Sequence, residues 1–156
     1  LPEAQLDRFM FNIWLDYPDV PQEIDIVKAT TMNKEVNLNK ILSAQEIIAF
    51  QNLIRKVPVP DNVYEFAVNL SAKTRPGYPG AHRMTNEYLA WGAGPRSSQF
   101  LIIGAKCNAA MNGKYAPDIE DVRNVAVPVM RHRLVRNYKA EAEAVKTETI
   151  IEALMV

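Results

Sequence analysis

The pattern of apolar and polar positions changes its period near residue 18. Before that point, apolar side chains alternate with other residues over positions 9–15. The alternating positions are Phe9, Phe11, Ile13 and Leu15. A period of two with aromatic and β-branched residues is typical of a β-strand. The sequence therefore predicts one strand, ended by Tyr17 and Pro18, and its sheet is expected elsewhere because a strand without a partner is not stable.

After this strand the apolar positions recur with a helical period. A short helix over residues 2–8 comes before the strand, with Pro2 in its first turn. Capping and first-turn residues predict where the later helices begin. These starts are Pro21, Ser43, Asp61, Pro95, Asp118 and Thr147. Ser43 and Glu46 form a capping box, and Gly113 is expected to end the helix that begins at Pro95.

The stripes behind these starts predict the apolar faces of the helices. Their members are Ile24 and Val27; Ile47, Phe50, Ile54 and Val57; Val63, Phe66, Ala67 and Leu70; Phe100, Ile103, Cys107 and Ala110; Ile119, Val122, Val125, Ala126 and Val129; Ile150, Ile151 and Leu154. Pro128 predicts a kink or an early end in its helix. Residues 75–94 are rich in glycine and proline, so we expect them to form the main loop. The fold class is thus mainly α: a helical bundle over residues 19–156, preceded by a short helix and one strand in residues 1–18.

The charge balance argues against nucleic acid as a partner. The 156 residues include 18 Lys and Arg and 18 Asp and Glu, so the formal net charge is zero. Such a balance provides no electrostatic footprint for nucleic acid or an anionic membrane. The sequence shows no apolar run long enough to span a bilayer and no signal-peptide pattern. Its single cysteine, Cys107, suits a reducing compartment, so we expect a cytoplasmic protein.

Two arginines stand in distinctive settings. Arg8 follows Leu-Pro-Glu-Ala-Gln-Leu-Asp at residues 1–7, and Arg96 follows Trp-Gly-Ala-Gly-Pro at residues 91–95. A guanidinium group is permanently charged, and its planar fork of donors matches phosphate oxygens. Arg96 is also expected in the first turn of a helix, where free N–H groups favour an anion. Without their context, Arg8 would more often pair with a surface carboxylate and Arg96 would more often be solvated.

Several other residues could bind a ligand or react, but we interpret each of them as structural. We expect the cluster of Arg131, His132 and Arg133 to lie on a solvated face or in an internal salt bridge. Trp14 and Trp91 are interpreted as packing residues, Cys107 as inert packing, and Glu141 with Glu143 as solvated surface. His82 has no second ligand at metal spacing, so no metal site is assigned.

The sequence contains no motif that would bind the phosphates of ATP. A P-loop needs a glycine, four residues, and then Gly-Lys-Ser/Thr. Gly113-Lys114 is followed by Tyr115, and Asn108 stands where the first glycine belongs. No apolar strand ending in Asp-Glu is present to hold Mg²⁺. The chain also begins at Leu1 rather than Met. We therefore interpret it as the trailing part of a longer protein and expect that it does not hydrolyse ATP alone.

Three blocks of residues, in the right order, resemble the MoxR family of AAA+ ATPases. Residues 1–9 are similar to the signature that ends the ATPase core of that family. Residues 88–97 (Tyr-Leu-Ala-Trp-Gly-Ala-Gly-Pro-Arg-Ser) resemble the start of its sensor-two helix. Residues 129–143 resemble its last characteristic block. There are two departures: Gly94 stands where the family usually has serine, and Pro117 comes earlier than usual before its helix.

The resemblance implies roles for particular residues. Arg8 would be the arginine finger that reaches the γ-phosphate held by an adjacent subunit. Arg96 would be the sensor-two arginine, and Gly94, Pro95 and Arg96 would lie at the nucleotide. Residues 1–18 would then end the AAA+ core, and residues 19–156 would form the helical lid.

The resemblance also implies ATP and Mg²⁺ as cofactors, bound mainly by the missing core, and ATP hydrolysis by the full-length protein. It implies a homo-oligomeric ring, expected to be a hexamer, with chaperone-like remodelling of other proteins and a von Willebrand A-domain partner. Two other interpretations stay open: a non-catalytic helical interaction module, and part of a ring motor that acts on nucleic acid.

Overall fold

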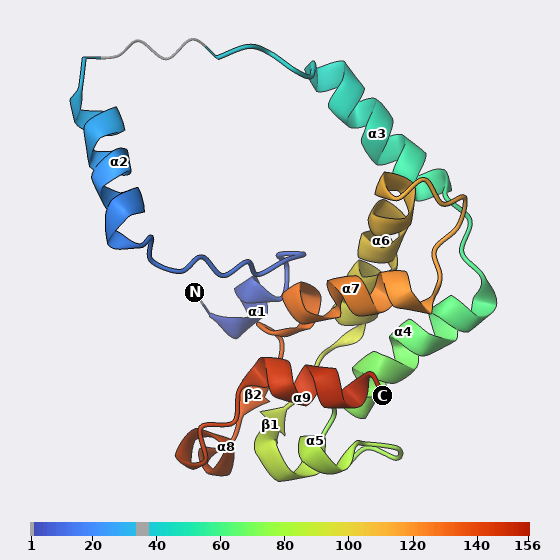
Figure 1. Ribbon diagram of the computed structural model, residues 1–156. Helices are drawn as coiled ribbons and strands as arrows, with labels where there is room; N and C mark the ends of the chain where they lie inside the picture. The colour runs from blue at the N-terminus through green and yellow to red at the C-terminus, as the bar shows by residue number, and fades with distance from the viewer. Residues whose placement is uncertain (1, 34–37) are drawn as a thin grey trace.

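The computed structural model describes residues 2–33 and 38–156, and it is mainly helical, as predicted (Figure 1). Its elements are α1 (Glu3–Leu6), α2 (Val20–Thr31), α3 (Ala44–Lys56), α4 (Asp61–Lys73), α5 (Arg83–Tyr88), β1 (Leu89–Trp91), α6 (Pro95–Met111), α7 (Ile119–Met130), β2 (Val135–Arg136), α8 (Tyr138–Ala142) and α9 (Thr147–Leu154).

The hydrophobic core lies between α4, α6, α7 and α9. Each of these helices contributes side chains that are almost fully removed from solvent. They include Val63, Ala67 and Leu70 of α4, Leu101 and Ala105 of α6, Val122, Ala126 and Val129 of α7, and Ile150, Ile151 and Leu154 of α9. The predicted stripes of α4, α7 and α9 are therefore confirmed, with Phe66 half-buried beside the core.

The buried face of α6 differs from the predicted one. Phe100, Ile103, Cys107 and Ala110 are only half-buried, whereas Ser97, Leu101, Ala105 and Ala109 face the core. The physical reason is that α6 is apolar on most of its circumference, so the hydrophobic pattern does not single out one face. Gly104 lets α7 come close, because a Cβ there would lie 3.1 Å from a methyl carbon of Val125.

Residues 9–15 do not form the predicted strand. From residue 11 to residue 19 the backbone has no regular structure and joins no sheet. Its one interaction with the body through a backbone amide is a 2.9 Å hydrogen bond from Asn12 to the carbonyl of Pro128. The cause is the lack of a pairing strand beside this segment in the part of the chain that the structure describes. Ile13 and Leu15 are consequently 74% and 92% exposed.

The predicted main loop contains regular structure. Residues 75–94 include α5 and β1, and β1 pairs antiparallel with β2, with Leu89 opposite Arg136. The glycine and proline cluster forms turns only in its first part, where Gly77 and Gly80 adopt positive φ. Leu89 is buried in the core cluster, which is a tertiary interaction that local composition does not reveal.

The predicted helix starts are close to the observed ones. The capping box of Ser43 and Glu46 is present, and Asp118 forms a second one with Asp121. Asp61 and Thr147 were expected to cap, but each is the first residue of its helix, after Pro60 and Lys146. Neither helix has a side-chain cap.

Gly113 was predicted to end the helix that is now α6, and Pro128 was predicted to kink or end α7. Gly113 has φ of 70° just beyond the end of α6, as a helix-ending glycine should. Pro128 does not end α7, which continues to Met130. One carbonyl of this last turn, that of Pro128, accepts instead from Asn12.

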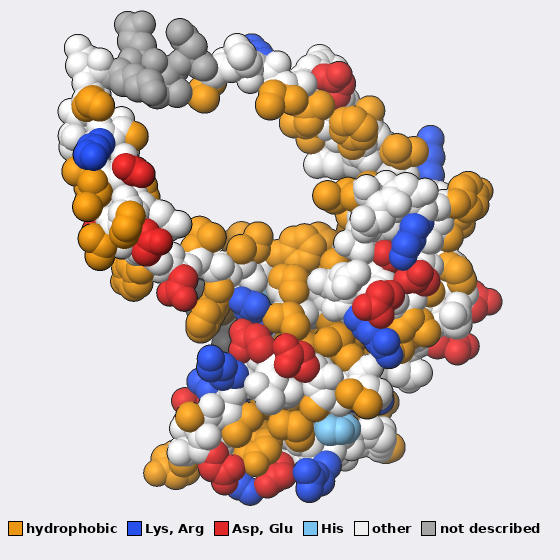
Figure 2. Space-filling view, in the orientation of Figure 1, with side chains coloured by type: hydrophobic (Ala, Val, Ile, Leu, Met, Phe, Trp, Pro, Cys, Tyr) orange, Lys and Arg blue, Asp and Glu red, His pale blue; other side chains and the backbone are white. Residues whose placement is uncertain are grey.

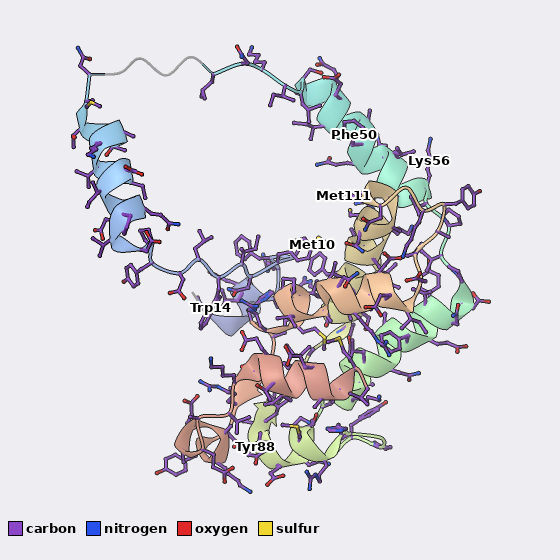
Figure 3. The ribbon with its side chains drawn as sticks, in the orientation of Figure 1. Met10, Trp14, Phe50, Lys56, Tyr88 and Met111 are labelled. Carbon is purple, nitrogen blue, oxygen red and sulfur yellow. The ribbon has the colours of Figure 1, made fainter. Side chains whose placement is uncertain are left out.

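The apolar sides of α2 and α3 are largely open to solvent. Space filling shows apolar side chains gathered along α3 and along the segment before α2 (Figure 2). Ile47 and Phe50, predicted to pack, are 46% and 53% exposed, and α2 buries no residue. Phe50 faces a groove that α3 shares with Ile103 and Cys107 of α6 (Figure 3). In residues 2–33 and 38–156, no helix has both the length and the apolar character needed to cross a membrane.

Candidate functional site

Arg8 lies on an exposed turn that directly follows α1. The turn is closed by backbone hydrogen bonds from Arg8 to Gln5 and from Phe9 to Leu6, each 3.1 Å long. The guanidinium group of Arg8 forms no ion pair within the described residues, and the residue is exposed. Among the side chains that the structure describes, no carboxylate pairs with Arg8.

Arg96 lies in the first turn of α6, as the sequence predicts. Gly94 is the N-cap residue, without a side-chain cap, and Pro95 is the first residue of the helix. The guanidinium of Arg96 donates to Oδ2 of Asp7 at 3.2 Å, and its side chain is 49% exposed. This ion pair brings Arg96 to the residue that precedes Arg8, across 89 positions of sequence.

Arg133 approaches the same carboxylate from the turn that follows α7. Its Nε donates to Oδ1 of Asp7 at 3.0 Å, while the Arg133 side chain is only 1% exposed. The other guanidinium nitrogens donate to the carbonyls of Asp7 at 2.9 Å, Phe9 at 2.7 Å and Met10 at 3.4 Å. The expectation of an internal salt bridge in this basic cluster is confirmed for Arg133. The sequence reasoning missed its partner, because Asp7 is 126 positions away.

His132 joins the same cluster. Its Nε2 lies 3.0 Å from the carbonyl oxygen of Phe9 and 2.7 Å from a guanidinium nitrogen of Arg133. Burial lowers the pKa of His132 below its usual range, and the positive charge of Arg133 lowers it further. The imidazole is therefore held in its neutral form at neutral pH.

The segment that leads into Arg96 is fastened to the end of α4. Thr74 is fully buried, and its hydroxyl accepts a 2.9 Å hydrogen bond from the amide of Ala93. Nε of Arg75 donates to the carbonyl of Ala93 at 3.0 Å. Gly92 passes so close that a Cβ there would lie 2.1 Å from the carbonyl oxygen of Thr74. The position of Arg96 is thus determined by packing that begins four residues earlier, at Gly92.

The remaining predicted candidates take no part in this cluster. His82 caps α5, its Nδ1 accepting from the amide of Met84 at 3.2 Å. Trp14 and Trp91 were expected to be packed, but they are 77% and 69% exposed, because the described residues do not cover them. Trp14 does lie under the guanidinium of Arg131, 5.8 Å from its ring centre, and is labelled in Figure 3. Burial raises the pKa of the half-buried Cys107 thiol, which agrees with inert packing.

Glu141 of α8 and Glu143, which follows its last residue, are exposed, as expected, and each has a partner. Glu141 lies 2.7 Å from the guanidinium of Arg136, and Glu143 accepts from the hydroxyl of Tyr88 at 2.9 Å. Tyr88, labelled in Figure 3, thereby joins α5 to α8.

The arrangement around Asp7 suits an anion. The half-exposed Arg96 and the buried Arg133 share the carboxylate of Asp7, and Arg8 follows Asp7 in the chain. A cavity of about 350 Å³ lies beside Asp7, lined in part by Gly94 and Arg133 but by neither Arg8 nor Arg96. Guanidinium groups donate only, so they fit phosphate oxygens and cannot hold a metal. Among the described residues, no three potential metal ligands come together.

Comparison with known proteins agrees with this geometry. Residues 81–154 match the family model described as the AAA lid domain. Residues 81–154 are therefore similar to an AAA lid domain. The matched residues include α6 with Arg96 and the turn after α7 with Arg133, whereas Arg8 lies before them. The resemblance noted from the three sequence blocks thus has independent support.

Three similar proteins match nearly the whole chain, and not only the lid region. Chaperone MoxR1 of Mycobacterium tuberculosis is 30% identical over 99% of this chain and 41% of its own length. YeaC of Bacillus subtilis is 26% identical over 99% of this chain and 46% of its own length. The crystal structure of a "putative ATPase" from Cytophaga hutchinsonii is 33% identical with a TM-score of 0.86, over 99% of this chain and 47% of that one.

These likenesses confirm that the chain resembles the MoxR-type AAA+ ATPases. The chain spans less than half the length of each relative it matches. AAA+ ATPases in general use a nucleotide with Mg²⁺ and usually assemble as oligomeric rings. The comparisons assign no role to Arg8, Gly94, Pro95 or Arg96.

Proposed function

We propose that this chain supplies the lid and the arginine finger of a MoxR-type AAA+ ATPase. The observation that carries the proposal is the ion pair between Arg96 and Asp7, because it joins the start of α6 to the residue that precedes Arg8. In this proposal residues 1–18 end the ATPase core and residues 19–156 form the lid. Gly94 and Pro95 present the first turn of α6 to the nucleotide.

Each arginine has the exposure that its role requires. Arg8 is exposed and free of ion pairs in the described residues, so it can reach a phosphate held outside its own polypeptide. Arg96 is half-exposed and held by one carboxylate, so it can exchange this partner for a phosphate. A fixed cation at the transferred phosphoryl group counts for much more in a site that excludes water.

ATP with Mg²⁺ supplies the phosphoryl group, and the residues of this chain fit its phosphates rather than its metal. No P-loop motif is present in the sequence, so the metal and most of the nucleotide are held elsewhere. We propose a homo-oligomeric ring, hexameric as the resemblance implies, in which Arg8 acts across the interface. Chaperone-like remodelling, a von Willebrand A-domain partner and a cytoplasmic location belong to the same proposal.

The test is the Arg8→Ala variant of the full-length protein. Turnover of ATP should fall by about 10³-fold or more while the nucleotide Kd stays nearly unchanged, because only transition-state stabilisation is lost. Arg123→Ala is the matched control, since Arg123 is a surface arginine paired with Glu120 at 3.4 Å.

A mixing experiment tests action in trans. Arg8→Ala subunits are combined with subunits that keep Arg8 but have a disabled P-loop lysine. Turnover should rise above that of either variant alone, because the second kind of subunit provides the finger. Unchanged turnover in Arg8→Ala itself would remove the finger assignment and favour a non-catalytic interaction module.

A further inference from the structure

Most donors of the Arg133 guanidinium group bond to one short segment of the chain, residues 7–10. The group donates to the carbonyls of Asp7, Phe9 and Met10 and to the carboxylate of Asp7. Two of these carbonyls, at 2.9 and 2.7 Å, belong to the residues on either side of Arg8. The backbone on both sides of Arg8 therefore cannot move without breaking hydrogen bonds to Arg133.

Arg133 offers almost no side-chain surface to a ligand. Its side chain is 1% exposed, and the ring of Phe100 lies 5.0 Å below its guanidinium carbon. Removing a charge from water is costly and is offset only by well-made hydrogen bonds. Burial accordingly lowers the pKa of Arg133, and Asp7 opposes this effect. Apart from the carbonyl of Val129 and the ring of His132, every hydrogen-bond partner of this buried charge belongs to residues 7–10, which points to a role that is exerted through the turn.

We infer that Arg133 is the positioning residue for Arg8: it fixes the finger turn to the turn that follows α7 and so ties the finger to the lid. This inference rests on the proposed function of Arg8. Arg96 strengthens the joint from α6, because it binds the second carboxylate oxygen of Asp7. Both helices lie within the AAA lid, so a movement of the lid carries the finger turn with it.

The planar fork is essential to this arrangement. Arg133 meets a carboxylate and three carbonyls at once, which needs donors that point along several fixed directions in one plane. A lysine has a single ammonium group and cannot bridge them. Arg133→Lys should therefore fail to replace arginine, although it keeps the charge.

The experiment compares Arg133→Met and Arg133→Lys in the full-length protein. A finger displaced by about 1 Å costs on the order of 10²-fold in rate, so kcat should fall by about 10- to 100-fold in both variants. KM and the nucleotide Kd should stay within about twofold, because Arg133 touches no ligand. Arg131→Met is the matched control, since Arg131 faces Glu148 at 3.4 Å and the ring of Trp14.

Mixing separates positioning from a general loss of structure. Arg133→Met subunits are mixed with P-loop-lysine variants that keep Arg133 and Arg8. If Arg133 acts only through its own Arg8, turnover at the intact P-loops should be restored, as in the mixture with Arg8→Ala. No restoration, with folded subunits in mixed rings, would overturn the inference, since the lid of the variant itself would then be at fault.

A second variant covers the case in which Arg133→Met does not fold. Asp7→Asn keeps the size of a half-exposed side chain and removes the charge that Arg133 binds. Asp7→Asn should lower kcat less than Arg133→Met does. Mixing it with P-loop-lysine variants should restore turnover in the same way. Full activity of Asp7→Asn and Arg133→Lys, beside an inactive Arg8→Ala, would refute positioning while leaving the finger in place. An active Arg8→Ala would instead refute the proposed function.

Discussion

The hydroxyl of Thr74, at the end of α4, accepts a hydrogen bond from the amide of Ala93, two residues before α6. The same hydroxyl donates to the carbonyl of Ser71 at 2.6 Å, so one buried oxygen links the two segments. Local backbone bonds do not satisfy the amide of Ala93, and Ala93 is buried. The start of the Arg96 helix therefore depends on a side chain 19 positions earlier.

The first prediction concerns this bond. Thr74→Val keeps the shape of the side chain but leaves the buried amide of Ala93 without a partner. The free energy of unfolding should fall by about 1–3 kcal/mol, measured by urea denaturation. Thr74→Ser retains the hydroxyl and should lose much less. Equal losses in the two variants would show that packing of the methyl group matters and the hydrogen bond does not.

The second prediction compares two glycines that are two residues apart. A Cβ at Gly92 would lie 2.1 Å from the carbonyl oxygen of Thr74, whereas a Cβ at Gly94 would have no atom within 4 Å. Gly92→Ser should therefore destabilise the lid by about 1–3 kcal/mol, because the backbone must move.

Gly94→Ser provides the internal control. It restores the residue that the MoxR family usually has, and a serine at the N-cap accepts a hydrogen bond from the first turn. The change should be neutral or stabilising by a few tenths of a kcal/mol. Thermal unfolding of both variants measures the difference, and a reversed order would contradict the close approach of Gly92 to Thr74.

The third prediction concerns pH. The pKa of His132 is lowered in the folded protein, first by burial and then by Arg133, from an ordinary value of 6.5. The unfolded chain therefore takes up this proton at a higher pH than the folded one. The contribution of His132 to stability is complete above pH 6.5 and is lost as the pH falls below it.

The measurement is urea unfolding of the protein and its His132→Gln variant across this range. The difference between their unfolding free energies should change with pH below 6.5 and be constant above it. Carboxylates that titrate at lower pH contribute equally to both proteins and cancel. A constant difference throughout would show that His132 titrates normally in the fold.

Local signals predicted the helices well where the apolar stripe was narrow. The starts near Ser43 and Asp118 follow from side chains that satisfy free N–H groups. The core faces of α7 and α9 follow from β-branched and leucine residues at helical spacing. Such features depend on neighbours within one or two turns, so the sequence contains them directly.

Features that depend on tertiary contacts could not be predicted from these local signals. The buried face of α6 is determined by how closely α7 approaches Gly104, and β1 exists because β2 pairs with it. The alternating segment at residues 9–15 has strand character without a strand beside it. In each case the deciding partner is distant in sequence or lies outside the described residues.

The candidate site was predicted in part. Arg96 lies in its predicted helix turn, and Arg8 lies on a turn next to Asp7. The role of Asp7 and the depth at which Arg133 is buried were not predicted. A carboxylate at position 7 and an arginine at position 133 show their relationship only once α7 is folded against the N-terminal turn.

The shared carboxylate leaves this end of the molecule electrically unbalanced. Asp7 offsets one of the two arginines that bind it, and Arg8 forms no ion pair with the side chains that the structure describes. The local positive charge favours an anion near this turn, and added salt screens the attraction.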